Sequence, residues 1–159
     1  MSISTITLKI NGTEITVPEG TTILKAAQVN GITIPTLCYL DGLTSYGGCR
    51  LCLVEVTGSP KLFAACATPV SQGMEVTTNS ERLKDYRKMA VQMLIAERTH
   101  VCSVCVADNN CELQELANQL GVDHVMYERK FTAPTTVINA DTTPINMIAK
   151  NGTLARFKR

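Results

Sequence analysis

Hydrophobic and polar residues alternate along the first part of the chain. The alternation runs through residues 5–10 and again through residues 14–17, with Asn11-Gly12 between the two segments. Such alternation is typical of strands with one buried face, and Asn-Gly readily adopts the positive φ angles of a two-residue hairpin turn. The pattern therefore predicts an antiparallel hairpin at the start of the chain.

One helix and several more strands are predicted after the hairpin. Thr21 or Thr22 can cap a helix with a mainly apolar face, and Gly31 is placed to end it. Segments rich in β-branched and apolar residues then predict strands at residues 51–57, 61–67 and 74–77. A hairpin, a crossing helix and these strands predict a mixed sheet of the beta-grasp type.

Helical spacing replaces alternation from Asn79-Ser80 onward. Ser80 can cap a helix over residues 81–97, and residues 111–120 predict a shorter helix that Gly121 would end. The apolar face expected for the first of these helices contains Leu83, Tyr86, Ala90, Met93 and Leu94.

Three parts are therefore expected in an α+β protein. They are a sheet domain over residues 1–79, a small helical domain over residues 80–125 and an extended docking tail over residues 126–159.

All seven cysteines fall into two groups, each built around a C-x2-C pair. The first group has the spacing C-x10-C-x2-C-x13-C and consists of Cys38, Cys49, Cys52 and Cys66. Four thiolates are the usual ligands of a 2Fe-2S cluster, and the glycines of the loop over residues 39–48 let a backbone approach the inorganic sulfides closely. We predict that these four cysteines bind a 2Fe-2S cluster.

Two other interpretations of the first group stay open at this stage. The cysteines would serve only as small apolar core residues in one of them, although the glycine-rich loop argues against it. A tetrahedral zinc site is the stronger alternative, because four-cysteine zinc sites also contain C-x2-C. Such sites usually pair two short motifs, whereas here only Cys49 and Cys52 are closely spaced.

The second group has the spacing C-x2-C-x5-C and supplies three thiolates, from Cys102, Cys105 and Cys111. A 4Fe-4S cluster needs a fourth ligand, and His100 is the nearest residue able to act as one. We interpret His124 as a surface or capping residue. A thioredoxin-like C-x2-C would follow a strand and open a helix, but Cys102 follows a predicted helix. We predict a 4Fe-4S cluster with one histidine and three cysteine ligands.

Charge and composition narrow the class of protein. The net charge of +1 provides no strongly basic face for nucleic acid, and no apolar run is long enough for a membrane span or a signal sequence. Seven cysteines, an odd number, favour metal ligation over a disulfide framework. We expect a cytoplasmic protein. Because G-x-G-x-x-G is absent, nucleotide and flavin are expected on other subunits.

The residues around the cysteines resemble a known family. Residues 47–52 (GGCRLC), 97–105 (ERTHVCSVC) and 111–114 (CELQ) resemble the iron-sulfur diaphorase subunit of NAD-linked bidirectional hydrogenases. They are also similar to the N-terminal part of the large iron-sulfur subunit of respiratory complex I and to the N-terminal region of iron-only hydrogenases. The resemblance implies a 2Fe-2S and a 4Fe-4S cluster that relay electrons between a flavin subunit handling NAD(P)H and a hydrogenase or other catalytic subunit.

Two features depart from the family pattern. In complex I three residues separate the ligand histidine from the first cysteine, a position held here by Arg98, whereas His100 matches the H-x-C form of the diaphorase relatives. The family also continues into a module with C-x2-C-x2-C-x3-C motifs, which this chain lacks, as it lacks the catalytic cysteines of iron-only hydrogenases. We expect a small relay subunit, with the missing clusters on another subunit.

Three functions compete at this stage. The leading one is an electron-transfer subunit of a multi-subunit NAD(P)-linked oxidoreductase, with a hydrogenase favoured over a formate dehydrogenase or a complex I-like relay. The second is a structural adaptor that holds zinc, which iron and zinc contents would distinguish. The third is a thiol oxidoreductase, which would need Cys102 or Cys105 as an accessible thiolate of low pKa.

Overall fold

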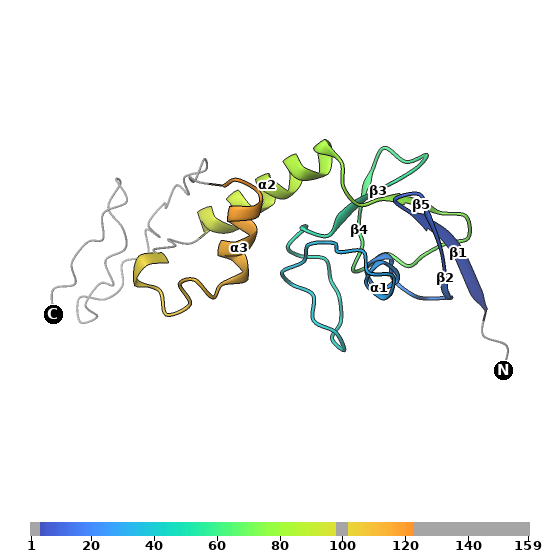
Figure 1. Ribbon diagram of the computed structural model, residues 1–159, viewed down its shortest axis with the longest axis horizontal. Helices are drawn as coiled ribbons and strands as arrows, with labels where there is room; N and C mark the ends of the chain where they lie inside the picture. The colour runs from blue at the N-terminus through green and yellow to red at the C-terminus, as the bar shows by residue number, and fades with distance from the viewer. Residues whose placement is uncertain (1–3, 98–101, 123–159) are drawn as a thin grey trace, which may run out of the picture. The chain divides into compact units, whose positions relative to one another are not determined.

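The computed structural model describes residues 4–97 and 102–122, which all belong to one compact unit of the chain (Figure 1). The first two strands, β1 (Thr5–Ile10) and β2 (Thr13–Pro18), pair antiparallel along their whole length. Asn11 and Gly12 join them with φ angles of 52° and 82°, the signs that a type I′ turn requires. The predicted hairpin is therefore confirmed.

The hairpin belongs to a five-stranded sheet with the strand order β2-β1-β5-β3-β4. The other strands are β3 (Leu53–Val56), β4 (Leu62–Ala64) and β5 (Glu75–Thr77). Strands β1 and β5 are parallel and all other neighbours are antiparallel, which confirms the mixed sheet. The three later strands are shorter than predicted. Strand β4, for example, ends because the Ala64 carbonyl accepts from the amides of Ala67 and Thr68 in a turn.

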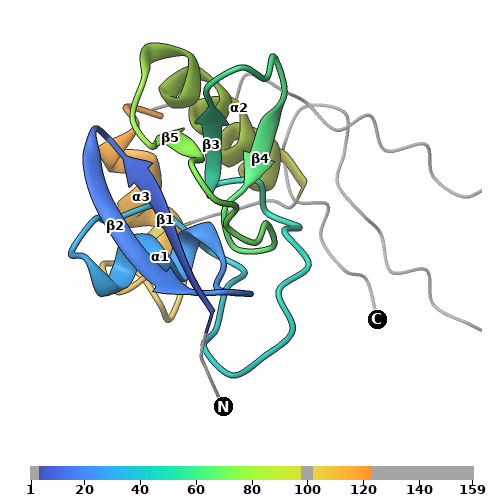
Figure 2. The ribbon, with the colours of Figure 1, turned by 90° about the vertical axis from the view of Figure 1, so that its right-hand side faces the viewer.

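Helix α1 (Ile23–Val29) lies across one face of this sheet (Figures 1 and 2). The Thr22 side chain caps it by accepting a hydrogen bond of 3.3 Å from the Lys25 amide, as predicted. Its apolar residues form the main core together with inward-facing residues of the sheet. The fully buried members of this core include Leu8, Ile10, Ile23, Leu24, Val54 and Val76.

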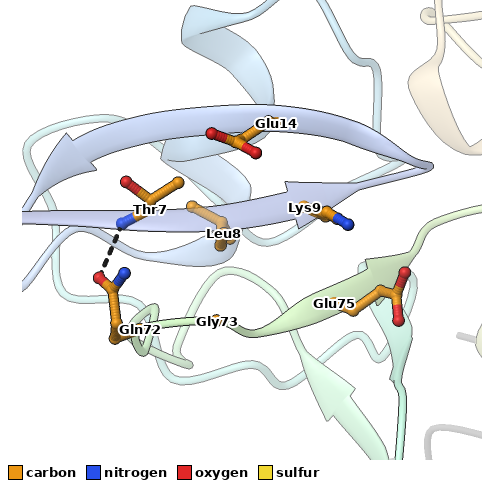
Figure 3. Close-up of a pocket in the computed structure, with 7 residues that line it drawn as sticks. All are labelled: Thr7, Leu8, Lys9, Glu14, Gln72, Gly73 and Glu75. Atoms are coloured by element: carbon orange, nitrogen blue, oxygen red, sulfur yellow. Dashed lines mark hydrogen bonds between the residues drawn. The ribbon is translucent and has the colours of Figure 1, made fainter.

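A polar side chain completes the backbone pairing between β1 and the turn before β5. The Gln72 Oε1 atom accepts a hydrogen bond of 3.0 Å from the Thr7 amide, where the short β5 strand offers no partner (Figure 3). A cavity of about 300 Å³ opens beside this contact. None of the residues that line it is a cysteine or a histidine, so we do not assign it to the predicted metal chemistry.

Helix α2 (Glu81–Glu97) follows the sheet and has the predicted bounds and cap. The Ser80 hydroxyl accepts from the Leu83 amide at 3.2 Å. The predicted apolar face was wrong in part, because Tyr86 and Met93 are 42% and 53% exposed. Leu83 is buried as predicted, and the other buried side chains of the helix are Arg87, Val91 and Gln92.

A second core joins the cysteine-bearing segment to the helices. Helix α3 (Glu112–Gln119) has its N-cap at Cys111 and ends at Leu120, before Gly121, as predicted. Its residues Leu116 and Ala117 pack with Val91 of α2 and with Leu51. Partly buried side chains of the preceding loop, including Leu37 and Cys49, pack against the same cluster. The position of Leu51 thus couples the loop to both helices.

Several predictions fall outside the part of the chain that the structure describes. They concern His100, His124 and the tail over residues 126–159. The domain boundaries after residues 79 and 125 also stay predictions. Within the described residues, no helix combines the length and the hydropathy that a membrane crossing needs.

Candidate iron-sulfur sites

Cys52 and Cys66 are brought together by the antiparallel pairing of β3 and β4. Cys52 directly precedes β3, and its carbonyl accepts a hydrogen bond of 3.0 Å from the Ala65 amide, next to Cys66. The two sulfur atoms lie 3.3 Å apart, and both residues are almost completely buried. A disulfide requires an S–S distance of about 2 Å, so the pair consists of two thiols held in contact.

Cys38 and Cys49 form a second pair. Cys38 lies in the segment that follows α1, and its sulfur accepts a hydrogen bond of 3.4 Å from the Cys49 amide. Both residues are half-buried. An amide that points at a sulfur is the kind of contact that stabilises bound thiolate and tunes the potential of a cluster.

Electrostatic interactions link Cys66 to the other three cysteines of the first group. The pKa of the Cys66 thiol is raised to about 12 by its burial, by the hydrogen bond with Cys52, and by the charges of Cys52, Cys38 and Cys49. Burial likewise raises the pKa of Cys38. Four ionised thiolates would therefore repel one another strongly here, and bound cations are needed to offset that charge.

The pKa of Cys49 is lowered, in contrast to those of Cys38 and Cys66. Burial alone would raise its pKa, but hydrogen bonds from the Leu51 amide and from Cys38 outweigh burial, so the pKa is lowered. Arg50, between Cys49 and Leu51, has a φ angle of 58°, a left-handed conformation that costs a residue with a side chain about 1–2 kcal/mol. The strained Arg50 backbone thus lies directly before the Leu51 amide, which donates to the Cys49 sulfur.

These observations fit a 2Fe-2S cluster. Each iron of such a cluster takes two thiolates, and the structure arranges the four cysteines as two pairs. Among residues 4–97 and 102–122, no three acidic, histidine or cysteine side chains converge as the ligands of a single metal ion do. The site thus offers paired sulfurs, amide donors and a largely buried setting for a two-iron group.

Gly47 supplies the close approach of backbone that was expected from the glycine-rich loop. Its φ angle is 65°, and a Cβ atom at this position would lie 3.2 Å from the Ala64 Cβ and 3.9 Å from the Cys66 sulfur. Gly42 has a similar φ angle of 85°, but a Cβ there would have no neighbour within 4 Å. The two glycines therefore share a conformation and differ in what surrounds them.

The substitution Gly47→Ala is expected to impair cluster retention. Both Gly47→Ala and the control Gly42→Ala impose left-handed strain of about 1–2 kcal/mol, but only the first crowds Ala64, which lies two residues before Cys66. We expect faster loss of 2Fe-2S absorbance in Gly47→Ala alone, measured by incubating the two proteins with an iron chelator. Equal rates of loss would show that the space beside Cys66 is not needed.

The second cysteine group is more exposed than the first. Cys102 opens a short 3-10 turn (Cys102–Val104), and its carbonyl accepts from the Cys105 amide at 3.0 Å. Cys102 and Cys105 are exposed, and Cys111 is half-buried at the start of α3. The sulfur of Cys105 accepts a hydrogen bond of 3.5 Å from the Ala107 amide. The described residues record no direct contact among these three thiols.

Gln114 holds the turn that separates Cys105 from Cys111. Its Oε1 atom accepts from the Asn109 amide at 2.9 Å, and its Nε2 atom donates to the Asp108 carboxylate at 2.9 Å. Asn109 has a φ angle of 61°, so the side-chain contact supports an uncommon backbone conformation. The sequence pattern alone gave Gln114 no role, because its partners lie in an irregular turn.

Two family models match the chain. One describes a 2Fe-2S iron-sulfur cluster binding domain and matches residues 4–81. The other describes an NADH-ubiquinone oxidoreductase-G iron-sulfur binding region and matches residues 87–126. The first match contains the first cysteine group and the second contains the other. Both cofactor predictions are thereby confirmed at the level of cluster type.

The chain is similar in sequence to subunits of two curated oxidoreductases. The chain is 41% identical over 118 residues to the mitochondrial 78 kDa subunit of NADH-ubiquinone oxidoreductase from Candida albicans, which covers 74% of this chain and 16% of the relative. It is 37% identical over 134 residues to subunit gamma of the NAD-reducing hydrogenase HoxS from Cupriavidus necator, covering 84% of this chain and 56% of the relative. The chain thus spans less than two thirds of either relative.

A solved structure has a similar fold. A chain in the crystal structure of an NAD+-reducing [NiFe]-hydrogenase in its H2-reduced state matches with a TM-score of 0.73 and 34% sequence identity. The match covers 79% of this chain and 53% of that chain. The α+β fold expected from the sequence is confirmed by this likeness and by the observed sheet.

Proposed function

We propose that the chain, whose sequence matches a 2Fe-2S iron-sulfur cluster binding domain and an NADH-ubiquinone oxidoreductase-G iron-sulfur binding region, relays electrons within a multi-subunit NAD(P)-linked oxidoreductase. The observation that carries this proposal is the pairing of Cys38 with Cys49 and of Cys52 with Cys66. A second group of ligands follows in the same chain.

Each group of residues has a defined task in this proposal. Cys38, Cys49, Cys52 and Cys66 hold the 2Fe-2S cluster, whereas His100, Cys102, Cys105 and Cys111 hold the 4Fe-4S cluster. The clusters supply one-electron oxidation and reduction when bound. The chain itself contributes burial of Cys52 and Cys66, amide donors at Cys38 and Cys49, and exposed ligands in the second group.

The partners proposed are a flavin-containing subunit that oxidises NAD(P)H and a catalytic subunit of the hydrogenase type. Relatives of this chain are subunits of such enzymes by name, which supports a hetero-oligomer. We place residues 126–159 at one of these contacts as a docking segment. A reducing compartment such as the cytoplasm suits a protein whose cysteines all serve as thiolate ligands.

The variant His100→Cys is expected to keep a 4Fe-4S cluster with a shifted potential. A thiolate would replace a neutral imidazole, which adds negative charge to the cluster and makes its reduced form less stable. We expect a more negative midpoint potential for this cluster in a redox titration followed by electron paramagnetic resonance. His124→Cys serves as the control, and an unchanged potential in His100→Cys would remove His100 from the ligand set.

Electron relay is tested by supplying NADH with and without a flavin subunit. We expect NADH alone to leave the anaerobic protein oxidised, because the sequence has no dinucleotide-binding motif. Addition of the purified flavin subunit of an NAD-reducing hydrogenase should then reduce both clusters, and a viologen dye should reoxidise them. Clusters that stay oxidised with NADH and the flavin subunit, yet are reduced by dithionite, would contradict the proposed partnership.

A further inference from the structure

Arg87 is a charged residue in an apolar setting. It lies in the middle of α2 and is only 5% exposed, between the buried residues Leu83 and Val91 of the same helix face. Within the described residues, no carboxylate lies within ion-pair distance of its guanidinium group. Burial of an uncompensated charge is strongly unfavourable, so the guanidinium group needs hydrogen-bond acceptors in the protein interior.

The guanidinium group makes that compensation with backbone carbonyls around Cys52. Its Nε atom donates to the Leu51 carbonyl at 3.0 Å, and its Nη2 atom donates to the Leu53 carbonyl at 2.9 Å and the Thr78 carbonyl at 2.8 Å. The Cys52 carbonyl itself accepts from the Ala65 amide. Three successive carbonyls, at residues 51, 52 and 53, are therefore fixed, which restrains the backbone that carries the Cys52 sulfur.

The charge of Arg87 also acts on the cysteine site. Burial lowers the pKa of Arg87, whereas a negative charge on Cys52 raises it, so the two groups interact through the protein interior. Arginine keeps its proton even when buried. A fixed positive charge in a poorly screened interior stabilises any nearby state with more negative charge, and reduction of a cluster adds one electron.

We propose that Arg87 is a positioning residue for the 2Fe-2S site, where it holds the backbone on both sides of Cys52 and its buried charge raises the reduction potential of the cluster. This inference rests on the proposed electron relay, since the charge has a redox effect only if a cluster occupies the site. Arg87 also ties α2, which leads toward the second ligand group, to the strand segment that carries the first.

Arg82 provides a matched control on the same helix. Its guanidinium donates to the Pro60 carbonyl at 3.0 Å and lies 3.5 Å from the Glu55 carboxylate, and its side chain is 49% exposed. It therefore resembles Arg87 in charge and in binding a strand segment. Solvent and Glu55 screen its charge, so its removal should not alter a buried cluster.

The test compares Arg87→Gln, Arg87→Lys and Arg82→Gln with the native protein. The readouts are the midpoint potential of the 2Fe-2S signal in an EPR-monitored titration and the melting temperature. Arg87→Gln should shift the potential to more negative values and lower the melting temperature. Arg87→Lys should have a lower melting temperature but a reduction potential near the native one. Lysine keeps the positive charge, but its ammonium group does not reproduce the hydrogen bonds of the planar guanidinium group. Arg82→Gln should keep the native potential.

The outcomes separate this inference from the function on which it rests. A native potential in a folded Arg87→Gln protein would overturn the electrostatic role, as would an equal shift in Arg87→Lys. If Arg87→Gln does not fold, Arg87→Met provides a second neutral variant, since its straight apolar side chain suits a buried helix position. Absence of any 2Fe-2S signal from the native protein would instead overturn the proposed relay itself.

Discussion

The variant Cys52→Ala is expected to abolish the 2Fe-2S signal while the 4Fe-4S signal persists. Cys52 is 1% exposed and its sulfur contacts that of Cys66, so alanine removes one ligand of four and leaves Cys66 without its partner. Metal binding that is coupled to folding is lost with its ligands, and residues around the site should loosen. The measurement is EPR of the dithionite-reduced protein, with iron counted on the same sample.

The reciprocal variant Cys105→Ala controls for general unfolding. Cys105 is exposed and belongs to the other group, so its loss should remove the 4Fe-4S signal and spare the 2Fe-2S signal. Cys38→Ala, at a half-buried position, repeats the first experiment with less disturbance of the core. Loss of both signals in every variant would contradict two independent sites, and retention of the 2Fe-2S signal in Cys52→Ala and Cys38→Ala would contradict their ligand roles.

The second large effect is expected for Leu51→Ala. Leu51 is fully buried beside Val91 and Leu116, in the core that joins the cysteine-bearing segment to α2 and α3. Truncation of such a leucine costs about 2–5 kcal/mol of unfolding free energy, through lost burial and the cavity left behind. We expect a lower midpoint of denaturation, measured with chemical denaturant under anaerobic conditions, and faster release of iron from the neighbouring site.

Leu40→Ala is the matched control for that experiment. Leu40 is a leucine of the loop between Cys38 and Cys49, but its side chain is 66% exposed. Its truncation should change the unfolding free energy by no more than about 0.5 kcal/mol, as is usual for surface substitutions. A similar loss of stability in the two variants would show that Leu51 does not bridge the loop and the helices as described.

Short-range sequence patterns were sufficient to predict much of the fold. Asn11-Gly12, the Thr22 cap and the Ser80 cap each act within a few residues, and all three are found where they were predicted. The mixed sheet and the bounds of α2 followed from the spacing of apolar residues. A turn shortened β4 because the Ala64 carbonyl accepts hydrogen bonds from the Ala67 and Thr68 amides and so takes no further part in strand pairing.

Long-range packing accounts for what the sequence did not predict. The apolar face of α2 was expected to include Tyr86 and Met93, whereas the structure buries Arg87 instead. A charged residue is normally expected at the surface, and the hydrogen bonds from Arg87 to the carbonyls of Leu51, Leu53 and Thr78 explain its burial. These acceptors lie 9 to 36 residues away in the sequence, beyond the reach of any local pattern.

The cysteine spacing grouped Cys38, Cys49, Cys52 and Cys66 as expected ligands of one cluster but did not predict which of them lie in contact. Cys38 with Cys49 and Cys52 with Cys66 became distinct pairs only with the register of β3 and β4 and the path of the loop. The second site remains a prediction at His100, and its cysteines are described without a contact among them.

The central claim is that one chain carries a 2Fe-2S and a 4Fe-4S cluster, and EPR of the anaerobically purified, dithionite-reduced protein tests it most directly. Iron, sulfide and zinc should be determined on the same sample. We expect one signal of each cluster type and about six irons per chain, the sum of the two clusters. A protein with stoichiometric zinc, little iron and no EPR signal would contradict the account and identify a structural zinc adaptor instead.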